Sequence, residues 1–156
     1  MAKILFIEDE IGRNWRVTGV LKDMKKLGHE VETACSGNEA IEKLENSRFE
    51  GILLSIMLPH GSGKKIPKEI KEIRMGIYIL ERLTNGDFEE RGTNRDVPVV
   101  VYSAVRDGCD VKRIKTMLRN EEWYFFKPRD PSVVAGVVDT ILKEDERGVG
   151  YRKEIR

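Results

Sequence analysis

The chain has 156 residues, of which 40% are hydrophobic, and this is enough to fill the core of one domain. Its 28 Lys and Arg residues nearly balance its 27 Asp and Glu residues, so charge gives no reason to expect a nucleic-acid or membrane partner. No segment reaches the length of a membrane span, and no signal peptide is evident. Cys35 and Cys109 fit no metal-binding spacing, so we expect reduced thiols and a cytoplasmic protein.

Strand-like and helix-like hydrophobic patterns alternate along the chain. Strands are predicted at 3–7, 30–34, 52–54, 98–102 and 123–126. Amphipathic helices are predicted around 17–27, 36–44, 66–83, 111–118 and 131–142. Alternation of this kind implies a parallel sheet with helices on both faces. Because crossovers are right-handed, it predicts an α/β, flavodoxin-like, doubly wound sheet of five strands in the order 2-1-3-4-5.

Local signals mark the ends of several predicted helices. Gly28 follows the last apolar position of the first helix and is expected to stop it. Ser36 and Glu39 have the spacing of a capping box, and Pro131 is typical of a helix start. Gly76 is expected to interrupt or kink the helical region 66–83.

Polar side chains follow four of the predicted strands. Glu8 and Asp9 follow the first strand, Ser55 the third, Ser103 the fourth and Lys127 the fifth. In a sheet of this topology these strand ends meet at one edge. Carboxylate oxygens suit Mg²⁺, whereas an amine and a hydroxyl suit phosphate oxygens. The sequence therefore indicates a site for a divalent cation and a phosphoryl group.

Four short motifs occur in order at these strand ends. They are Glu8-Asp9, Met57-Leu58-Pro59, Ser103-Ala104 and Lys127-Pro128. Each motif alone is weak, but together they resemble the receiver domain of response regulators, the phosphoacceptor half of two-component signalling. The resemblance extends from Lys3 to about Leu142.

The resemblance implies a metal site at the first strand. Asp9, helped by Glu8, would hold Mg²⁺, and the backbone carbonyl of Met57 would be a further ligand. These roles are expectations that come from the family.

The resemblance also implies roles for residues of the last two strands. Ser103 would hydrogen-bond the phosphoryl group, and Lys127 would pair with a phosphoryl oxygen. The bond between Lys127 and Pro128 would be cis. Tyr124 matches the aromatic residue whose rotamer reports the switch, although plain core packing is the simpler interpretation.

Ser55 is the first departure from the receiver pattern, because a receiver has the phosphate-accepting aspartate at this position. A neutral serine hydroxyl is a weak nucleophile unless a base activates it. With one acid fewer, Mg²⁺ should bind more weakly, and Lys127 is expected to pair with Asp9. We therefore expect that Ser55 does not accept phosphate as the aspartate would. The sequence leaves open whether Ser55 is native, in a degenerate receiver, or a replacement that silences a working one.

Length is the second departure. From Ser55 to Ser103 the chain runs 48 positions, and the surplus lies in an extended segment around 61–96. Such a segment beside the site suits a partner surface or a lid, but a tolerated insertion is an equally good interpretation. We expect one receiver-like domain over 1–142 and a charged, frayed tail over 143–156.

The partners follow from the same resemblance. We expect a stand-alone signalling module that binds a histidine kinase or phosphotransfer protein and a downstream protein target, with no nucleic acid and no membrane. Receivers often pair through the fourth and fifth helices and the last strand, so a homodimer is a further expectation. His29 and His60 are isolated in the sequence and are expected at the surface.

The alternative hypothesis is an enzyme. A Mg²⁺-dependent phosphotransferase or phosphatase could use Ser55, activated by Asp9 or Glu8, as a nucleophile. No pair of residues that would act as base and orienting group is evident, and a fold does not imply a function. We therefore do not expect an enzyme.

Overall fold

Five parallel strands form one sheet in the computed structural model, which describes residues 1–146. The strands are β1 (Lys3–Ile7), β2 (Glu30–Ala34), β3 (Gly51–Leu54), β4 (Val99–Ser103) and β5 (Tyr124–Phe126). Their order across the sheet is β2-β1-β3-β4-β5, and every neighbouring pair is parallel. The predicted strand order and fold class are confirmed.

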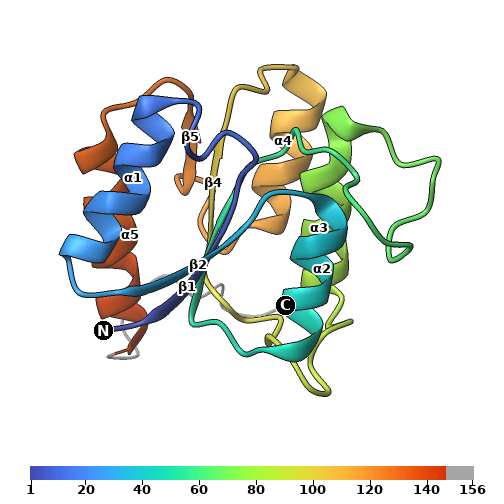
Figure 1. Ribbon diagram of the computed structural model, residues 1–156, viewed down its shortest axis with the longest axis horizontal. Coiled ribbons are helices and arrows are strands. Elements are labelled where there is room, and N and C mark those ends of the chain that lie inside the picture. Colours follow the sequence, from blue (N-terminus) through green and yellow to red (C-terminus); the bar gives the residue numbers. More distant parts are fainter. Residues whose placement is uncertain (147–156) are drawn as a thin grey trace.

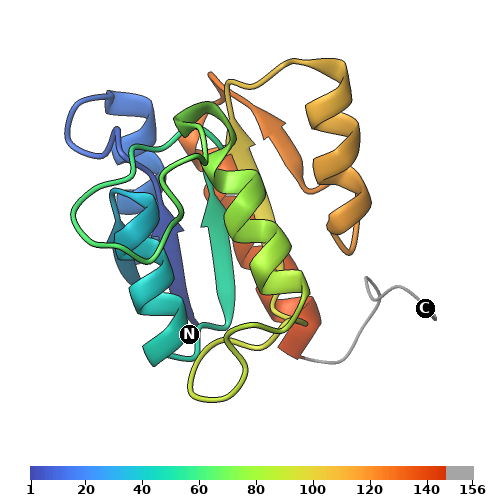
Figure 2. The ribbon, with the colours of Figure 1, turned by 90° about the vertical axis from the view of Figure 1, so that its right-hand side faces the viewer.

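Helices cover both faces of the sheet. They are α1 (Trp15–Lys26), α2 (Gly37–Asn46), α3 (Met75–Thr84), α4 (Gly108–Met117) and α5 (Pro131–Glu146), with a short 3₁₀ turn, η1 (Glu72–Arg74), before α3. Figure 1 shows α1 and α5 packed together on one face and α2, α3 and α4 on the other. Figure 2, turned by 90°, shows α3 lying along the sheet in front of the central strands.

The central strands are apolar because both of their faces are covered. In β1, Ile4 through Ile7 have no solvent exposure, and the β3 residues Ile52, Leu53 and Leu54 are 2% exposed or less. The edge strand β2 carries Glu30 and Glu32 on either side of Val31 and is mostly only partly buried, since one side of it meets solvent. Burial of the middle of the sheet fixes the register that brings the strand ends together.

The predicted capping box and the predicted helix start and stop residues are found in the structure, but the Glu39 side chain of the capping box has a different partner. The Ser36 hydroxyl accepts a hydrogen bond from the Glu39 N–H at 3.2 Å, as a capping box requires. The Glu39 carboxylate accepts from the N–H of Cys35 rather than from that of Ser36. Pro131 is the first residue of α5, and Gly28 after α1 has a φ of 95°, which favours glycine.

The expected helix over 66–83 exists only in its second half. Residues 61–71 form an irregular loop, and the regular helix α3 begins at Met75. Ile66, Ile70 and Ile73 have helical spacing, but Ile66 is buried at 4% exposure while Ile73 is 51% exposed, so they do not share one face. The helical spacing of these three isoleucines is therefore accidental. They lie in and after an irregular loop, and Ile66 is the one that packs into the core.

Gly76 does not kink α3. A Cβ at this position would lie 2.5 Å from the backbone of Ile56 and the carbonyl oxygen of Ser55. The N–H of Gly76 also donates to the carbonyl of Ile56 at 2.8 Å. Gly76 is therefore the point where α3 approaches the segment after β3, and this contact fixes the backbone of Ser55 from behind.

Asn38, at the start of α2, anchors the extended segment after β3. Its side-chain amide donates to the carbonyl of His60 at 2.8 Å, and its carbonyl accepts from the N–H groups of Lys65 and Ile66 at 2.7 and 3.2 Å. Asn38 is 3% exposed. One buried side chain thus replaces the backbone partners that an irregular loop lacks.

The second half of the extension packs against the end of α2. The N–H of Thr93 donates to the carbonyl of Leu44 at 3.0 Å, and its hydroxyl donates to the carbonyl of Ser47 at 2.7 Å. The same hydroxyl accepts from the N–H of Phe49 at 3.1 Å. The polar segment before β4 is a loop, and these hydrogen bonds tie it to the rest of the domain.

The expected surface position is wrong for His29, which is buried, while His60 is only partly buried. His29 is 8% exposed, and its Nδ1 accepts from the N–H of Ala2 at 3.1 Å while its Nε2 donates to Asp139 at 2.7 Å. His60 is half-buried, and its Nε2 donates to the carbonyl of Ile70 at 2.6 Å. Both side chains hold distant segments together.

The boundary predicted at residue 142 falls inside α5, which continues to Glu146. The first four residues of the expected frayed tail are therefore helical, and residues 147–156 lie outside the described part of the chain. Among residues 1–146, no helix is both long enough and apolar enough to cross a membrane.

Replacing Asn38 by Ala should lower the free energy of unfolding by about 2–3 kcal/mol, because the N–H groups of Lys65 and Ile66 lose their partner and the carbonyl of His60 keeps only the backbone N–H of residue 38. Urea denaturation measures the loss, and limited proteolysis should show faster cleavage within 61–71. Asn46→Ala is the control, since Asn46 is exposed on the same helix and bonds only the carbonyl of Glu42. Equal stability losses in the two variants would contradict the anchoring role.

Replacing Asp139 by Asn should cost about 1–3 kcal/mol near neutral pH, because a buried charged hydrogen bond with His29 is lost. Burial raises the pKa of Asp139, but hydrogen bonds from Lys143 and His29 outweigh it and hold the pKa below its ordinary value. The stabilisation from the lowered pKa is present above the unfolded-state value, about 3.9, and disappears as pH falls through the folded-state value.

Urea denaturation at several pH values tests this dependence. The stability difference between the wild type and Asp139→Asn should be largest near neutral pH and should shrink in acid. Asp96→Asn, at an exposed position, should show a small difference at every pH. A difference for Asp139→Asn that stays constant down to strongly acidic pH would count against the ionic contribution.

Candidate functional site

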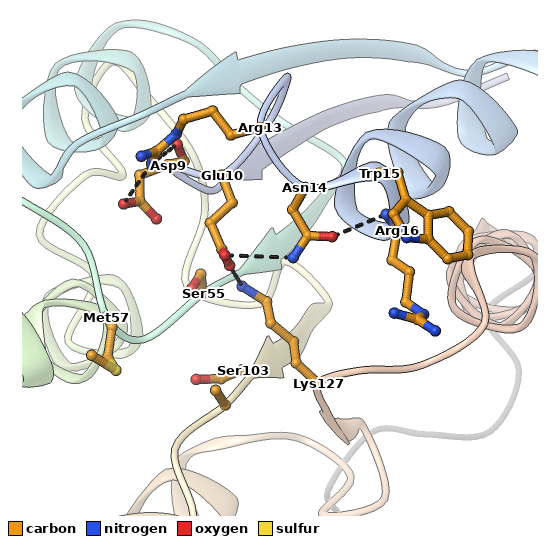
Figure 3. A pocket seen from close by; sticks show the side chains of 11 residues that line it. Asp9, Glu10, Arg13, Asn14, Trp15, Arg16, Ser55, Met57, Ser103 and Lys127 are labelled. Atoms are coloured by element: carbon orange, nitrogen blue, oxygen red, sulfur yellow. Dashed lines mark hydrogen bonds and ion pairs between the residues drawn. The ribbon is translucent and has the colours of Figure 1, made fainter.

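The carboxyl ends of four strands surround one open pocket of about 710 Å³. The register pairs Ile7 with Leu54 and Leu54 with Val101, so the residues that follow β1 and β3 emerge side by side. The lining residues are Asp9, Glu10, Arg13, Asn14, Trp15, Arg16, Ser55, Met57, Ser103, Ala104 and Lys127 (Figure 3). The lining includes no residue of the 61–96 extension, so the lid interpretation of that segment has no support.

Three consecutive acids follow β1, and each has a different environment. Glu8 has no solvent exposure, and its Oε2 accepts from the N–H of Glu10 at 3.1 Å. Asp9 is partly exposed and lies 3.4 Å from the guanidinium of Arg13, which also donates to the Asp9 carbonyl at 2.7 Å. Glu10 lines the pocket, where Asn14 donates a long hydrogen bond of 3.5 Å to its Oε2.

Lys127 reaches across the pocket from β5 to the acids after β1. Its Nζ lies 2.6 Å from Oε1 of Glu8 and 2.7 Å from Oε1 of Glu10, and its side chain is 11% exposed. Figure 3 shows the Lys127 side chain directed at Glu10, while Asp9 faces Arg13. The expected pairing of Lys127 with Asp9 is therefore wrong, because Asp9 pairs with Arg13, four positions further along the turn after β1.

The charges of this cluster support one another. Burial acts to lower the pKa of Lys127, but the Coulombic attraction of Glu8 and the hydrogen bonds to Glu10 and Glu8 raise it above the ordinary value. The hydrogen bond from Lys127 is the main reason why the pKa of Glu10 is lowered. Burial raises the pKa of Glu8, and the ammonium of Lys127 opposes that rise. Lys127 and Glu10 are therefore charged at neutral pH.

Ser55 lies at the floor of the pocket, directly after β3. It is 3% exposed, and its N–H donates to the carbonyl of Ile7 at 2.9 Å, so the backbone position is fixed. Within residues 1–146 its hydroxyl makes no hydrogen bond to another protein group. No side chain is therefore placed to accept its proton.

Ser103 and Tyr124 are joined through one residue of the loop after β4. The Ser103 hydroxyl accepts from the N–H of Val105 at 3.2 Å, and the Tyr124 hydroxyl donates to the carbonyl of Val105 at 2.9 Å. Ser103 and Tyr124 are 1% and 7% exposed. Movement of either side chain would disturb this loop. The peptide bond between Lys127 and Pro128 is cis, as expected.

The oxygen donors fit a divalent cation poorly in this arrangement. Of the three expected ligands, Asp9 and Met57 line the pocket, but Glu8 lies beneath the ammonium of Lys127. In the described part of the chain, no three His, Cys, Asp or Glu side chains are grouped so that they could hold a metal ion. A cation could reach Glu8 only if Lys127 moved away.

Sequence reasoning gave no role to Glu10, Arg13 or Trp15, all of which line the pocket. Glu10 was visible as the third of three consecutive acids, and its distance to Lys127 could not be read from 117 positions of separation. Trp15 is 70% exposed and stacks against the guanidinium of Arg16. The sequence signal that could have pointed to this rim is a tryptophan between the polar residues Asn14 and Arg16.

Comparison with known proteins gives relatives of one kind. No family model matches the sequence. The chain is similar to the transcriptional regulatory protein CpxR homolog of Haemophilus influenzae, with 36% identity over 122 residues that cover 76% of this chain and 51% of that protein. It is also similar to the alkaline phosphatase synthesis transcriptional regulatory protein PhoP of Bacillus subtilis, with 32% identity over 78 residues, 50% of this chain and 31% of that protein. The chain thus spans about half the length of the first relative and less of the second.

Solved structures share the fold. A CheY-like response regulator receiver domain protein from Methanospirillum hungatei superposes with a TM-score of 0.69, at 19% identity, over 96% of this chain and 99% of that one. The receiver domain of a Francisella response regulator gives a TM-score of 0.67 at 17% identity, over 93% and 99% of the two chains. This chain is therefore similar in sequence to response regulators, and it has the CheY-like fold of their receiver domains.

Proposed function

We propose that this receiver domain acts in a phosphorelay through protein–protein contacts and that Ser55 stands at the phosphoacceptor position without accepting phosphate. The observation that carries the proposal is the position of Ser55 at the end of β3, between the acids after β1 and Ser103 after β4. The partners would be a histidine kinase or phosphotransfer protein and a downstream protein target, met in the cytoplasm.

The chemistry of the pocket supports a silent acceptor position. A receiver carboxylate attacks phosphorus as an anion, whereas a serine hydroxyl must lose its proton to a base. Ser55 has no such base within the described residues, because Glu8 and Glu10 are engaged by Lys127 and Asp9 by Arg13. The same absence of a base removes support from the alternative in which Ser55 is an enzyme nucleophile.

The remaining groups of the pocket are those that a receiver would use. Ser103 and Lys127 are held at the rim by β4 and β5, where the N–H of Lys127 donates to the carbonyl of Ser103 at 2.9 Å. A carboxylate introduced at Ser55 would add a partner for Lys127 and an oxygen ligand for Mg²⁺, which could then reach Asp9 and Glu8. Mg²⁺ would supply charge neutralisation for the incoming phosphoryl group.

Incubation with acetyl phosphate and Mg²⁺, followed by intact mass measurement, tests the proposal. The Ser55→Asp variant should gain one phosphoryl group, while the wild type should gain none. Ser62→Asp is the control, because Ser62 is exposed on the loop after β3 and does not line the pocket. A phosphoryl group on Ser55 of the wild type would overturn the proposal, and so would an unmodified Ser55→Asp variant.

The proposal includes a homodimer formed through α4, β5 and α5. Val133 on α5 is 41% exposed, and it lines a shallow, largely apolar hollow with Phe125, Val137 and Ile141. Apolar surface of this kind gains free energy when a second copy covers it.

Sedimentation velocity at increasing concentration measures the dimer. The wild type should shift from monomer to dimer, and Val133→Asp should weaken association by about tenfold or more, because a charge would have to be buried in the interface. Ile73→Asp, at a residue of the extension that is 51% exposed, should leave association unchanged. A wild type that stays monomeric at the highest concentration would rule out this dimer.

A further inference from the structure

The pocket contains a positively charged side chain of the protein itself, the ammonium of Lys127. The ammonium of Lys127 lies within 2.7 Å of one carboxylate oxygen from Glu8 and one from Glu10. Lysine side chains normally extend their charged end into water, yet this side chain is only 11% exposed. Two carboxylate partners compensate for the hydration that the ammonium has lost.

Glu10 explains how Lys127 keeps two partners although position 55 is a serine. Ser55 is neutral, so it offers no carboxylate to the ammonium. Glu10 is 39% exposed and stands at the pocket wall, where Asn14, the N-cap residue of α1, donates to its Oε2. Its other oxygen, Oε1, accepts from Lys127 at 2.7 Å. Glu10 therefore supplies the negative charge that the acceptor position does not.

The same arrangement leaves few free oxygen ligands for a divalent cation. Mg²⁺ dehydrates reluctantly and demands nearly octahedral oxygen coordination. Here Oε1 of Glu8 is occupied by an ammonium, Oε2 of Glu8 accepts from the backbone of Glu10, and Asp9 is paired with Arg13. A second cation in the pocket would also be repelled by the charge of Lys127.

We propose that the ammonium of Lys127, held by Glu10 as a positioning residue, takes the place of the divalent cation in this pocket, so that the resting site is neutralised without Mg²⁺. The inference rests on the proposed function for the identity of the site. It adds that the wild-type domain is in a metal-independent state, in which a partner meets an open pocket whose acids Glu8 and Glu10 are already paired with Lys127.

Direct titration with Mn²⁺ as a stand-in for Mg²⁺ tests this inference on the full chain. Electron paramagnetic resonance follows the loss of the free Mn²⁺ signal on binding. The wild type should show no pocket binding in the low millimolar range, and Lys127→Met should bind about tenfold or more tightly, because the acids are released. Adding Asp9→Asn, which removes an expected ligand, to Lys127→Met should remove most of that gain, whereas Glu10→Gln alone should raise binding above the wild type because Lys127 loses its positioning partner.

Two further variants separate a loss of charge from a loss of structure. Lys127→Arg keeps a cation beside Glu8 and Glu10, so it should bind Mn²⁺ as poorly as the wild type. Lys112→Met removes an exposed lysine on α4 and should also leave binding unchanged. Binding by the wild type that matches that of Lys127→Met would overturn the inference, as would a Lys127→Met variant that is folded and gains nothing.

Thermal unfolding of the wild type provides a second test that does not depend on the folding of Lys127→Met. Added Mg²⁺ should leave the melting temperature of the wild type unchanged beyond what an equal ionic strength of Na⁺ produces. A specific rise that Asp9→Asn abolishes would show a metal site with Lys127 in place and would overturn the inference. These readouts involve no phosphodonor, so the metal-independent state and the phosphorylation result for Ser55→Asp can fail separately.

Discussion

The contact of Lys127 with Glu8 and Glu10 links the end of the last strand to the end of the first. These strands are separated in the sheet by β3 and β4, so the Lys127 side chain reaches past the carboxyl ends of both to contact the acids after β1. Glu8 can stay fully buried because this positive charge lies beside it, since an unpaired buried carboxylate is strongly unfavourable. The shape and the charge of the pocket both depend on this one contact.

Because residue 55, at the end of β3, is a serine, Lys127 pairs with Glu8 and Glu10 and not with a carboxylate at position 55. An aspartate there would compete for the ammonium and attract a metal ion, whereas Ser55 does neither. The charge cluster is then satisfied by Glu10, which the first helix steadies through Asn14. Under the proposed function, a domain of this kind would present a constant surface to its partners, because the step that rearranges the pocket would have no nucleophile.

The neighbouring elements hold the floor of the pocket from behind. Gly76 lets α3 come against the backbone of Ser55 and Ile56, and Asn38 fastens the loop that precedes α3 to α2. The extension is therefore part of the packed domain and lies away from the pocket mouth. Its own surface, beside Ile73 and α3, is free to differ from receivers without altering the strand ends.

Local sequence determined the strands, most helices and their order. Runs such as 4–7 and 99–102 are apolar throughout because both faces of a central strand are buried, and the alternation with helices leaves few arrangements of a parallel sheet. The same pattern placed Glu8, Asp9, Ser55, Ser103 and Lys127 at one edge, since strand ends converge in this topology.

Tertiary structure decided the contacts between these residues. Three consecutive acids could each have faced Lys127, and only the folded turn after β1 directs Glu8 and Glu10 to it and Asp9 to Arg13. Ile66 and His29 are buried because they contact distant partners, Asn38 and Asp139 respectively. The expected helix begins only at Met75, because the residues before it form a loop that is held by such contacts. Hydrophobic spacing reports only which face of a local element is apolar, so a contact across many positions of sequence cannot be obtained from it.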